Sequence, residues 1–167
     1  MENVILIQVP KNKEIEKVRK KYDPNHKNFK PHISIVYPFP KTNPKDLDEH
    51  IKNSIKKIKP FKITLNGLKK STKDYYLYLL VDKGEGTIKK LYKNLHRKLL
   101  NKYKNKDMPR YIPHITLGIF KTKKEIDEAL KEIKKINLRL EFTLNKISLL
   151  TIDKNHKIKS TKGYKLK

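Results

Sequence analysis

The sequence contains one four-residue pattern twice, at equivalent places in its two halves. Pro-His-Ile-Ser at residues 31–34 returns as Pro-His-Ile-Thr at residues 113–116, so the second copy follows 82 residues after the first. In a chain of 167 residues this spacing is close to half the length, and each copy follows a polar loop, at 23–28 and 107–110. Such self-similarity is typical of an internal duplication, which constrains the chain to fold as two related halves.

The hydrophobic pattern supports the duplication, because each half predicts the order strand, helix, strand, helix, strand. The elements expected in the first half are strands at 4–9, 32–37 and 61–66 and helices at 11–21 and 44–58. Those expected in the second half are strands at 75–81, 114–120 and 138–144 and helices at 88–105 and 122–133, followed by strands at 147–152 and 157–166. We therefore expect an α+β fold in one domain over residues 1–167, with lobes of about 1–70 and 71–167 related by an approximate two-fold axis.

Several local signals mark where these elements begin and end. Asn43-Pro44 is typical of a helix N-cap followed by proline, and Thr122 with Glu125 forms a capping box. Pro38 and Pro40 are expected to close the second strand, and Gly67 to end the third. Gly84-Glu85-Gly86 is predicted to be a turn.

Composition excludes several classes of protein. The chain has no cysteine, so disulfides, thiolate metal sites and a cysteine nucleophile are excluded. No apolar run approaches the roughly 20 residues that cross a bilayer. The apolar stretch at residues 4–7 follows Met1-Glu2-Asn3 without a basic leader, which predicts a strand and not a secretory signal. We expect a soluble, cytoplasmic, monomeric protein.

The formal net charge is +25, from 42 basic and 17 acidic residues, and it would attract polyanions such as RNA in a salt-dependent manner. Only four of the basic residues are arginines, although phosphate-binding surfaces favour the arginine fork. The lysines are also scattered along the whole chain. Compositional bias and selection for a nucleic-acid partner both remain open explanations.

The repeated pattern places an imidazole and a hydroxyl side by side. On a strand, residues i and i+2 point to the same face, about 6.6 Å apart. His32 therefore shares a face with Ser34, and His114 shares a face with Thr116, while the isoleucines between them face the core. If the halves pack about a two-fold axis, both pairs can face one cleft and bracket one phosphate group.

Two histidines suit in-line attack at phosphorus without a metal ion. A neutral imidazole can take a proton from the attacking water while a protonated one gives a proton to the leaving oxygen. The unperturbed pKa of about 6.5 lets both forms coexist near neutral pH. The hydroxyls of Ser34 and Thr116 can donate hydrogen bonds to the nonbridging oxygens. The sequence leaves open which histidine is the acid and which the base.

The duplicated His-hydrophobic-Ser/Thr-hydrophobic motif resembles that of the 2H phosphoesterase superfamily, which includes the bacterial 2′-5′ RNA ligase-like proteins and cyclic phosphodiesterases. The likeness covers nearly the whole chain, and the segments 19–24 and 33–39 resemble a small bacterial branch of that superfamily. The resemblance implies a bilobal α+β fold with antiparallel sheets lining a central cleft. It also implies metal-independent cleavage of 2′,3′-cyclic phosphates or 2′-5′ linkages in RNA ends or nucleotides, reversible as ligation, without a cofactor. By the same resemblance His32, Ser34, His114 and Thr116 form the catalytic set.

Other residues near the motifs are candidates for substrate binding. Tyr37, Arg110 and Tyr111 could stack a base or hold a phosphate, and Lys30 could add charge at the mouth of the cleft. The alternative is that the two tyrosines pack at strand ends. Tyr75, Tyr76 and Tyr78 form either an aromatic binding surface or, more commonly for such a strand, core and rim. The remaining histidines are expected at the surface: His26, His50, His96 and His156.

A rival hypothesis assigns the chain to a different class of protein. A basic RNA-binding module could recognise terminal phosphates in the same cleft without turning them over, as the charge of +25 would favour. A third hypothesis is an esterase for a small phosphodiester other than RNA. The sequence supplies no helical His-Glu-x-x-His pattern and no glycine-rich phosphate loop, so neither a metal site nor a nucleotide-binding loop is expected.

Overall fold

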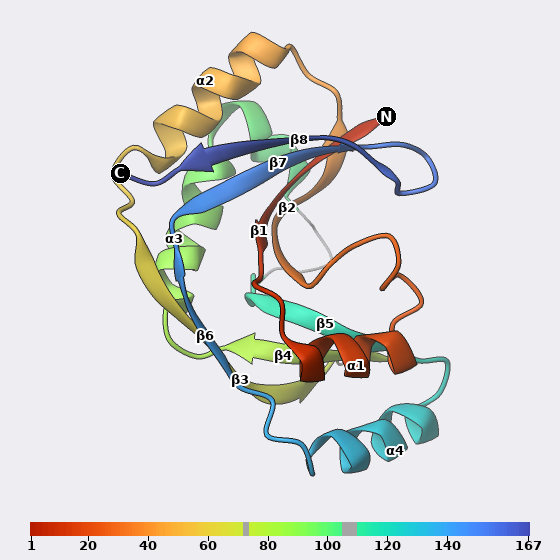
Figure 1. Ribbon diagram of the computed structural model, residues 1–167. Helices are drawn as coiled ribbons and strands as arrows, with labels where there is room; N and C mark the ends of the chain where they lie inside the picture. The colour runs from red at the N-terminus through yellow and green to blue at the C-terminus, as the bar shows by residue number, and fades with distance from the viewer. Residues whose placement is uncertain (72–73, 105–109) are drawn as a thin grey trace.

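The computed structural model describes residues 1–71, 74–104 and 110–167, which form two four-stranded antiparallel sheets flanked by helices (Figure 1). The first sheet has the order β2 (His32–Pro40), β1 (Glu2–Gln8), β7 (Lys146–Ile152), β8 (Ile158–Lys165). The second sheet has the order β5 (His114–Ile119), β4 (Tyr76–Val81), β3 (Phe61–Lys70), β6 (Leu140–Leu144). The predicted α+β class with antiparallel sheets is confirmed.

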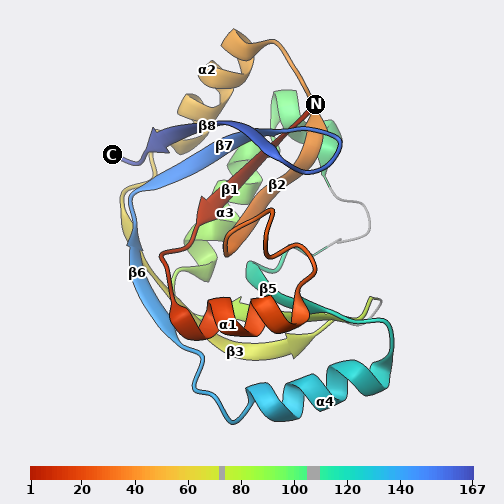
Figure 2. The ribbon, with the colours of Figure 1, turned by 45° about the vertical axis from the view of Figure 1, so that its right-hand side comes forward.

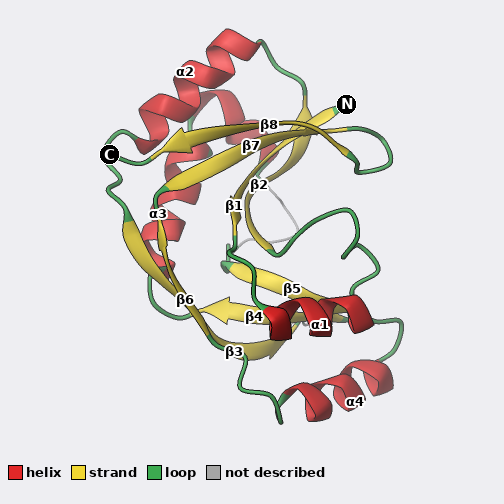
Figure 3. Cartoon of the chain, in the orientation of Figure 1, coloured by secondary structure: helices red, strands yellow, loops and turns green. Residues whose placement is uncertain are grey.

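The predicted duplication of element order is also confirmed (Figure 3). The helices are α1 (Lys13–Tyr22), α2 (Pro44–Ile55), α3 (Glu85–Leu95) and α4 (Lys123–Ile133), with a 3₁₀ helix, η1, at Lys98–Tyr103. Asn43 accepts hydrogen bonds from the first amides of α2, and Thr122 and Glu125 form the expected capping box of α4. Most of the second predicted polar loop, at 107–110, lies outside the described residues.

Each sheet draws strands from both halves of the chain. β3 belongs to the first half but pairs with β4 of the second, and β7 belongs to the second half but pairs with β1 of the first. The expected lobe boundary near residue 70 therefore does not coincide with the boundary between the sheets. Burial explains this exchange, because β3 and β7 each extend the apolar face of the opposite half's sheet and join both halves around one core.

Helices α1 and α3 follow the same crossed arrangement, whereas α4 contacts β4 of its own half (Figures 1 and 2). α1 comes after β1 in the chain yet packs against β5, and α3 comes after β4 yet packs against β2. In both views the segment between α1 and β2 lies between α1 and the strands β1 and β2. One hydrophobic cluster, which includes Ile5, Ile33, Leu79 and Ile115, spans the two sheets. The crossed packing ties the two repeated motifs to a single core.

The two motif strands are the edges of their sheets, and both carry a bulge three residues after the histidine. Ile5 pairs with Val36 and Leu6 with Ser34, which leaves Ile35 as an extra residue. Leu117 is the extra residue in β5, between Gly118 and Thr116. The burial pattern is identical over the first six residues of the two strands. A bulge changes the side-chain alternation that follows it, so Tyr37 and Ile119 return to the face of the motifs.

Some predicted boundaries were wrong, each for a local reason. β2 continues through Pro38 to Pro40, because an edge strand tolerates residues that lack an amide donor. β3 continues to Lys70 because Gly67 adopts a φ of +91° and the chain resumes pairing at Leu68. The helix expected at 88–105 ends at Leu95, where His96 Nδ1 donates to the carbonyl of Tyr92, and η1 follows. No helix in the described ranges is long and apolar enough to cross a membrane.

The predicted turn at Gly84-Glu85-Gly86 was also wrong, because Gly84 is the N-cap of α3 and the other two residues begin the helix. Gly84 has a φ of +88°, a conformation that favours glycine. A Cβ atom at this position would lie 2.7 Å from the carbonyl oxygen of Lys62, whereas one at Gly86 would meet nothing within 4 Å.

These two glycines make a matched pair for a stability test. We expect Gly84→Ala to lower the free energy of unfolding by about 1–3 kcal/mol, because the backbone is strained and Lys62 is in the way. Gly86→Ala should instead raise it by about 0.5–1 kcal/mol, because alanine favours the helix. Urea unfolding followed by circular dichroism measures both. Equal effects of the two substitutions would contradict the assignment of Gly84 as the cap.

Candidate functional site

Both histidines of the repeated motif are held by the same main-chain hydrogen bond. Nδ1 of His32 donates to the carbonyl oxygen of Lys30 at 2.8 Å, and Nδ1 of His114 donates to that of Ile112 at 2.7 Å. Each acceptor lies two residues before its histidine, just before the proline. The bond sets the orientation of each ring as its strand begins.

This hydrogen bond also selects the tautomer. A carbonyl oxygen can only accept, so a neutral imidazole in this position carries its proton on Nδ1. Nε2 then has the lone pair and is the nitrogen that gains or loses a proton. Ser34 and Thr116 are partly buried, like the two histidines, and the burial pattern places each on the same face as its histidine.

Burial keeps both imidazoles neutral in the ligand-free protein. It lowers the pKa of His32, although the carbonyl of Lys30 acts in the opposite direction. It lowers the pKa of His114 to about 4, and the charge of His32 contributes to this shift. The two rings are therefore within electrostatic reach of each other. An anion bound between them would raise both pKa values and favour protonation.

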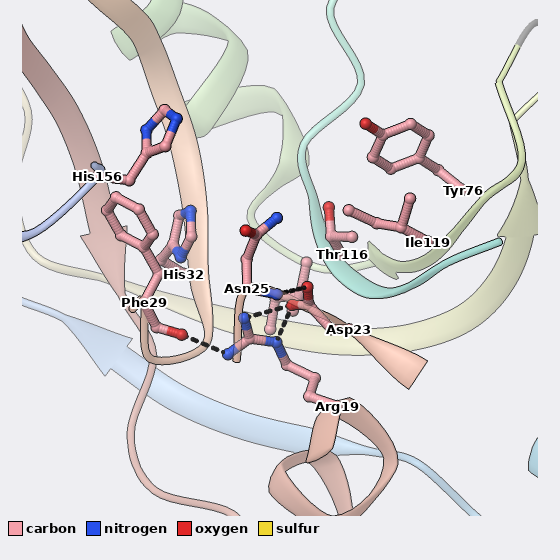
Figure 4. A pocket seen from close by; sticks show the side chains of 10 residues that line it. Arg19, Asp23, Asn25, Phe29, His32, Tyr76, Thr116, Ile119 and His156 are labelled. Carbon is pink, nitrogen blue, oxygen red and sulfur yellow. Dashed lines mark hydrogen bonds and ion pairs between the residues drawn. The ribbon is translucent and has the colours of Figure 1, made fainter. Parts of the chain in front are cut away.

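A cavity of about 220 Å³ lies beside the motifs, and its wall joins four separate parts of the chain (Figure 4). The residues that line it are Arg19, Asp23, Asn25, Phe29, His32, Tyr76, Ile115, Thr116, Ile119 and His156. The fold thus brings His32 of the first motif and Thr116 of the second to one cavity. His114 and Ser34 are not part of its lining.

Aromatic rings flank both motif histidines. The ring centroid of Phe29 lies 5.4 Å from that of His32 and 6.5 Å from that of His156. On the other side the rings of Tyr78 and His114 are 3.8 Å apart and inclined by 35°. In Figure 4, Phe29 and His156 stand across the cavity from Tyr76 and Ile119. The flat walls can accept a planar group beside the imidazoles.

The two tyrosines singled out in the sequence have different surroundings. Tyr111 is buried, its ring stacks on Tyr92 at 4.1 Å and 7°, and its hydroxyl donates to the carbonyl of Ser34 at 2.8 Å. Tyr111 therefore packs at the end of its strand, and no face of its ring is left to stack on a base. Tyr37 is partly buried near Tyr78 and Tyr92, and burial raises its pKa to about 12, which keeps the phenol neutral.

The two basic candidates lie at the surface. The side chains of Lys30 and Arg110 are exposed, and neither belongs to the cavity wall. The observed contribution of Lys30 is its carbonyl oxygen, which holds His32. A contact of either side chain with substrate remains a prediction.

Of the four histidines expected at the surface, His96 is buried and His156, although exposed, belongs to the cavity wall. His96 is 1% exposed, because it caps α3 and its ring packs on Tyr92 at 4.1 Å. His156 is exposed but lines the cavity from the turn between β7 and β8. Its position could not be predicted locally, since the pairing of β7 with β1 brings that turn to the site.

Sequence reasoning also missed the contribution of α1 and the loop that follows it. Arg19, Asp23, Asn25 and Phe29 all line the cavity. The segment 19–24 stood out by resemblance, but no local signal assigned it a function. Tyr76 also lines the cavity, and the alternation of β4 left its role as rim or binding surface undecided.

Comparison with known proteins identifies the family. The model of the 2′-5′ RNA ligase superfamily matches residues 7–156. The chain belongs to this superfamily. The expected relationship to the 2H phosphoesterases is thereby confirmed. Among curated protein sequences no similar one is found.

Solved structures of the same fold agree with membership of the 2′-5′ RNA ligase superfamily. Escherichia coli LigT in its apo form is 14% identical with a TM-score of 0.54, and the match covers 99% of this chain and 94% of that one. LigT complexed with 3′-AMP is 13% identical with a TM-score of 0.56, covering 99% and 95%. Kluyveromyces marxianus Usb1 with uridine monophosphate is 12% identical with a TM-score of 0.58, covering 99% and 98%.

Ligands for a metal ion were not expected from the sequence. Within residues 1–71, 74–104 and 110–167 the structure contains no group of three or more His, Cys, Asp or Glu side chains suited to hold one. Metal-independent chemistry remains a prediction that is tested below by chelation.

The lowered pKa of His114 predicts a pH dependence of stability. Its pKa is about 4 in the folded protein and about 6.5 in the unfolded chain, so between these values the unfolded chain binds more protons. Stability is therefore lost as the pH falls from 6.5 toward 4. We expect this group alone to remove about 2 kcal/mol between pH 7 and pH 5.

Urea unfolding of the wild type and His114→Asn at both pH values measures this contribution. The variant should lose less stability than the wild type by that amount. Equal losses in the two proteins would contradict a neutral, buried His114.

Proposed function

We propose that this protein is a metal-independent phosphodiesterase that acts on 2′,3′-cyclic phosphate or 2′-5′ linked RNA ends or nucleotides. The observation that carries the proposal is the duplicated arrangement of a histidine fixed through Nδ1 and a hydroxyl residue on the same strand face. Membership of the 2′-5′ RNA ligase superfamily supports a phosphoesterase. The 3′-AMP and uridine monophosphate in the structures of LigT and Usb1 support a nucleotide substrate.

In the proposed reaction the phosphate lies between the imidazoles of His32 and His114. The unprotonated Nε2 of one histidine takes a proton from water, whose oxygen forms a bond to phosphorus. The bond from phosphorus to the 2′ or 3′ oxygen breaks, and Nε2–H of the other histidine protonates that oxygen. Run in reverse with a hydroxyl nucleophile, the same exchange of protons joins two ends.

The hydroxyls of Ser34 and Thr116 are proposed to donate hydrogen bonds to the nonbridging oxygens, where charge shifts during the displacement. Because both imidazoles are neutral without ligand, the acid acquires its proton when the anionic phosphate is bound. The cavity, at about 220 Å³, is smaller than the roughly 300 Å³ at which common ligand pockets begin. It suits one terminal nucleotide, with the remainder of an RNA chain outside.

Tyr37, Lys30 and Arg110 remain proposed substrate contacts at the rim. For Tyr111 the buried ring supports a structural role instead. A monomeric state and a cytoplasmic location also stay predictions.

Substitution of the motif residues tests the proposal. We expect His32→Asn and His114→Asn each to lower kcat for nucleoside 2′,3′-cyclic phosphates by about 10²–10⁴-fold, because each removes a proton-transfer group. Ser34→Ala and Thr116→Val should each cost up to about 10²-fold, because one hydrogen-bond donor is lost. Hydrolysis is followed by separating the nucleotide products, with EDTA present throughout.

The matched control is His50→Gln. His50 lies on α2 and donates from Nε2 to the carbonyl of Leu95, away from the cavity, so kcat should not change. Activity that survives both motif substitutions, or that is lost on chelation, would contradict the proposal. Salt-dependent RNA binding that is unaffected by both substitutions, without cleavage, would favour the RNA-binding alternative.

A further inference from the structure

A buried ion pair lies at the base of the cavity, in the sequence segment that the proposed reaction does not use. Arg19 on α1 and Asp23 just after it are each 4% exposed. Nε and Nη2 of Arg19 both donate to Oδ2 of Asp23, at 3.0 and 2.5 Å. Removing two charges from water costs more than such a pair usually returns, so stability alone is a poor explanation for it.

The pair holds both ends of the loop between α1 and β2. Nη1 of Arg19 donates to the carbonyl of Phe29 at 2.9 Å, and Oδ1 of Asp23 accepts from the amide of Asn25 at 2.8 Å. The amide of Phe29 in turn donates to the carbonyl of Asn25 at 3.1 Å. Further hydrogen bonds within the loop add to these contacts, so the shape of residues 23–29 depends in part on one guanidinium and one carboxylate, whose contacts Figure 4 shows.

This loop ends where His32 is held. Phe29 packs beside the imidazole, and the next residue, Lys30, supplies the carbonyl that accepts from Nδ1. A shift of the loop would move both the flanking ring and the acceptor that selects the tautomer. The pair also acts on His32 through its charges, since Arg19 lowers the pKa of the imidazole and Asp23 raises it.

We propose that Arg19 and Asp23 form a positioning pair that fixes the loop 23–31 and thereby the orientation and tautomer of His32. The inference deepens the proposed function and rests on it for the role of His32. The second motif is held differently, because there Tyr111 stacks on Tyr92 and donates to Ser34. The positioning pair is thus assigned to the first half-site.

The test replaces both partners at once. A single substitution would leave an uncompensated buried charge and could unfold the protein, whereas the apolar double variant Arg19→Met/Asp23→Leu can stay folded. We expect kcat to fall by roughly 10- to 100-fold, because His32 is misplaced. KM should change by less than about threefold, because Tyr37 and Arg110, the proposed substrate contacts outside this loop, remain.

The second readout needs no substrate. In ¹⁵N NMR spectra of the wild type near neutral pH, His32 should appear as the Nδ1–H tautomer, whereas the double variant should show a mixture of both tautomers. A matched control is Lys21→Met/Glu132→Leu, which removes an exposed ion pair between α1 and α4, with side chains 60% and 58% exposed. It should leave kcat and the His32 signals unchanged.

Three results would overturn the inference. A double variant that is only less stable, with wild-type kcat and tautomer, would make the pair purely structural. A rise in KM at constant kcat would make Arg19 a substrate contact. A mixed tautomer already present in the wild type would refute the fixed orientation. If the wild type cleaves no phosphodiester, the proposed function fails, while the NMR comparison still decides whether the pair positions His32.

Discussion

The exchange of strands between the two halves is the constraint on which the site depends. Because β3 joins the sheet of β4 and β7 joins the sheet of β1, neither half can fold its sheet without the other. The edge strands β2 and β5 are then held by one shared core, and the hydroxyl of Tyr111 ties the segment before β5 to the main chain of β2. The motifs, distant in the sequence, are thereby set against each other by burial of apolar surface.

Within this frame, the chemistry of the imidazoles is determined by the main chain and by burial. A carbonyl two residues upstream occupies Nδ1 of each histidine, so that Nε2 is the nitrogen available for proton transfer. Burial opposes the charged form, and the aromatic neighbours Phe29 and Tyr78 add to the exclusion of water. Both histidines therefore share the main-chain hydrogen bond and the burial, although the side chains that contact the beginning of each strand differ.

The features predicted well from the sequence are those that local periodicity determines. The duplicated element order, the capping box at Thr122 and the shared face of each histidine and its hydroxyl residue followed from spacing alone. The strand exchange could not be predicted in this way, because the alternation of apolar and polar residues does not determine which strands pair with each other. For the same reason Phe29 and His156 were missed, since long-range pairing brings them to the cavity. Tyr37 was expected to contact substrate, and this stays a prediction; the bulge that turns Tyr37 to the face of the motifs is invisible in the sequence pattern.

The bulges at matching positions of β2 and β5 affect which side chains can face a bound substrate. They leave Tyr37 and Ile119 at matching positions, the sixth residue of two strands with the same burial pattern. One is an aromatic ring with a hydroxyl group, and the other is a branched aliphatic chain. In the proposed reaction a phosphodiester between the motifs would have unlike side chains at these two matching positions, so turning it end for end would not give an equivalent complex. A difference at one pair of matching positions would then give a duplicated site a preferred direction for its substrate.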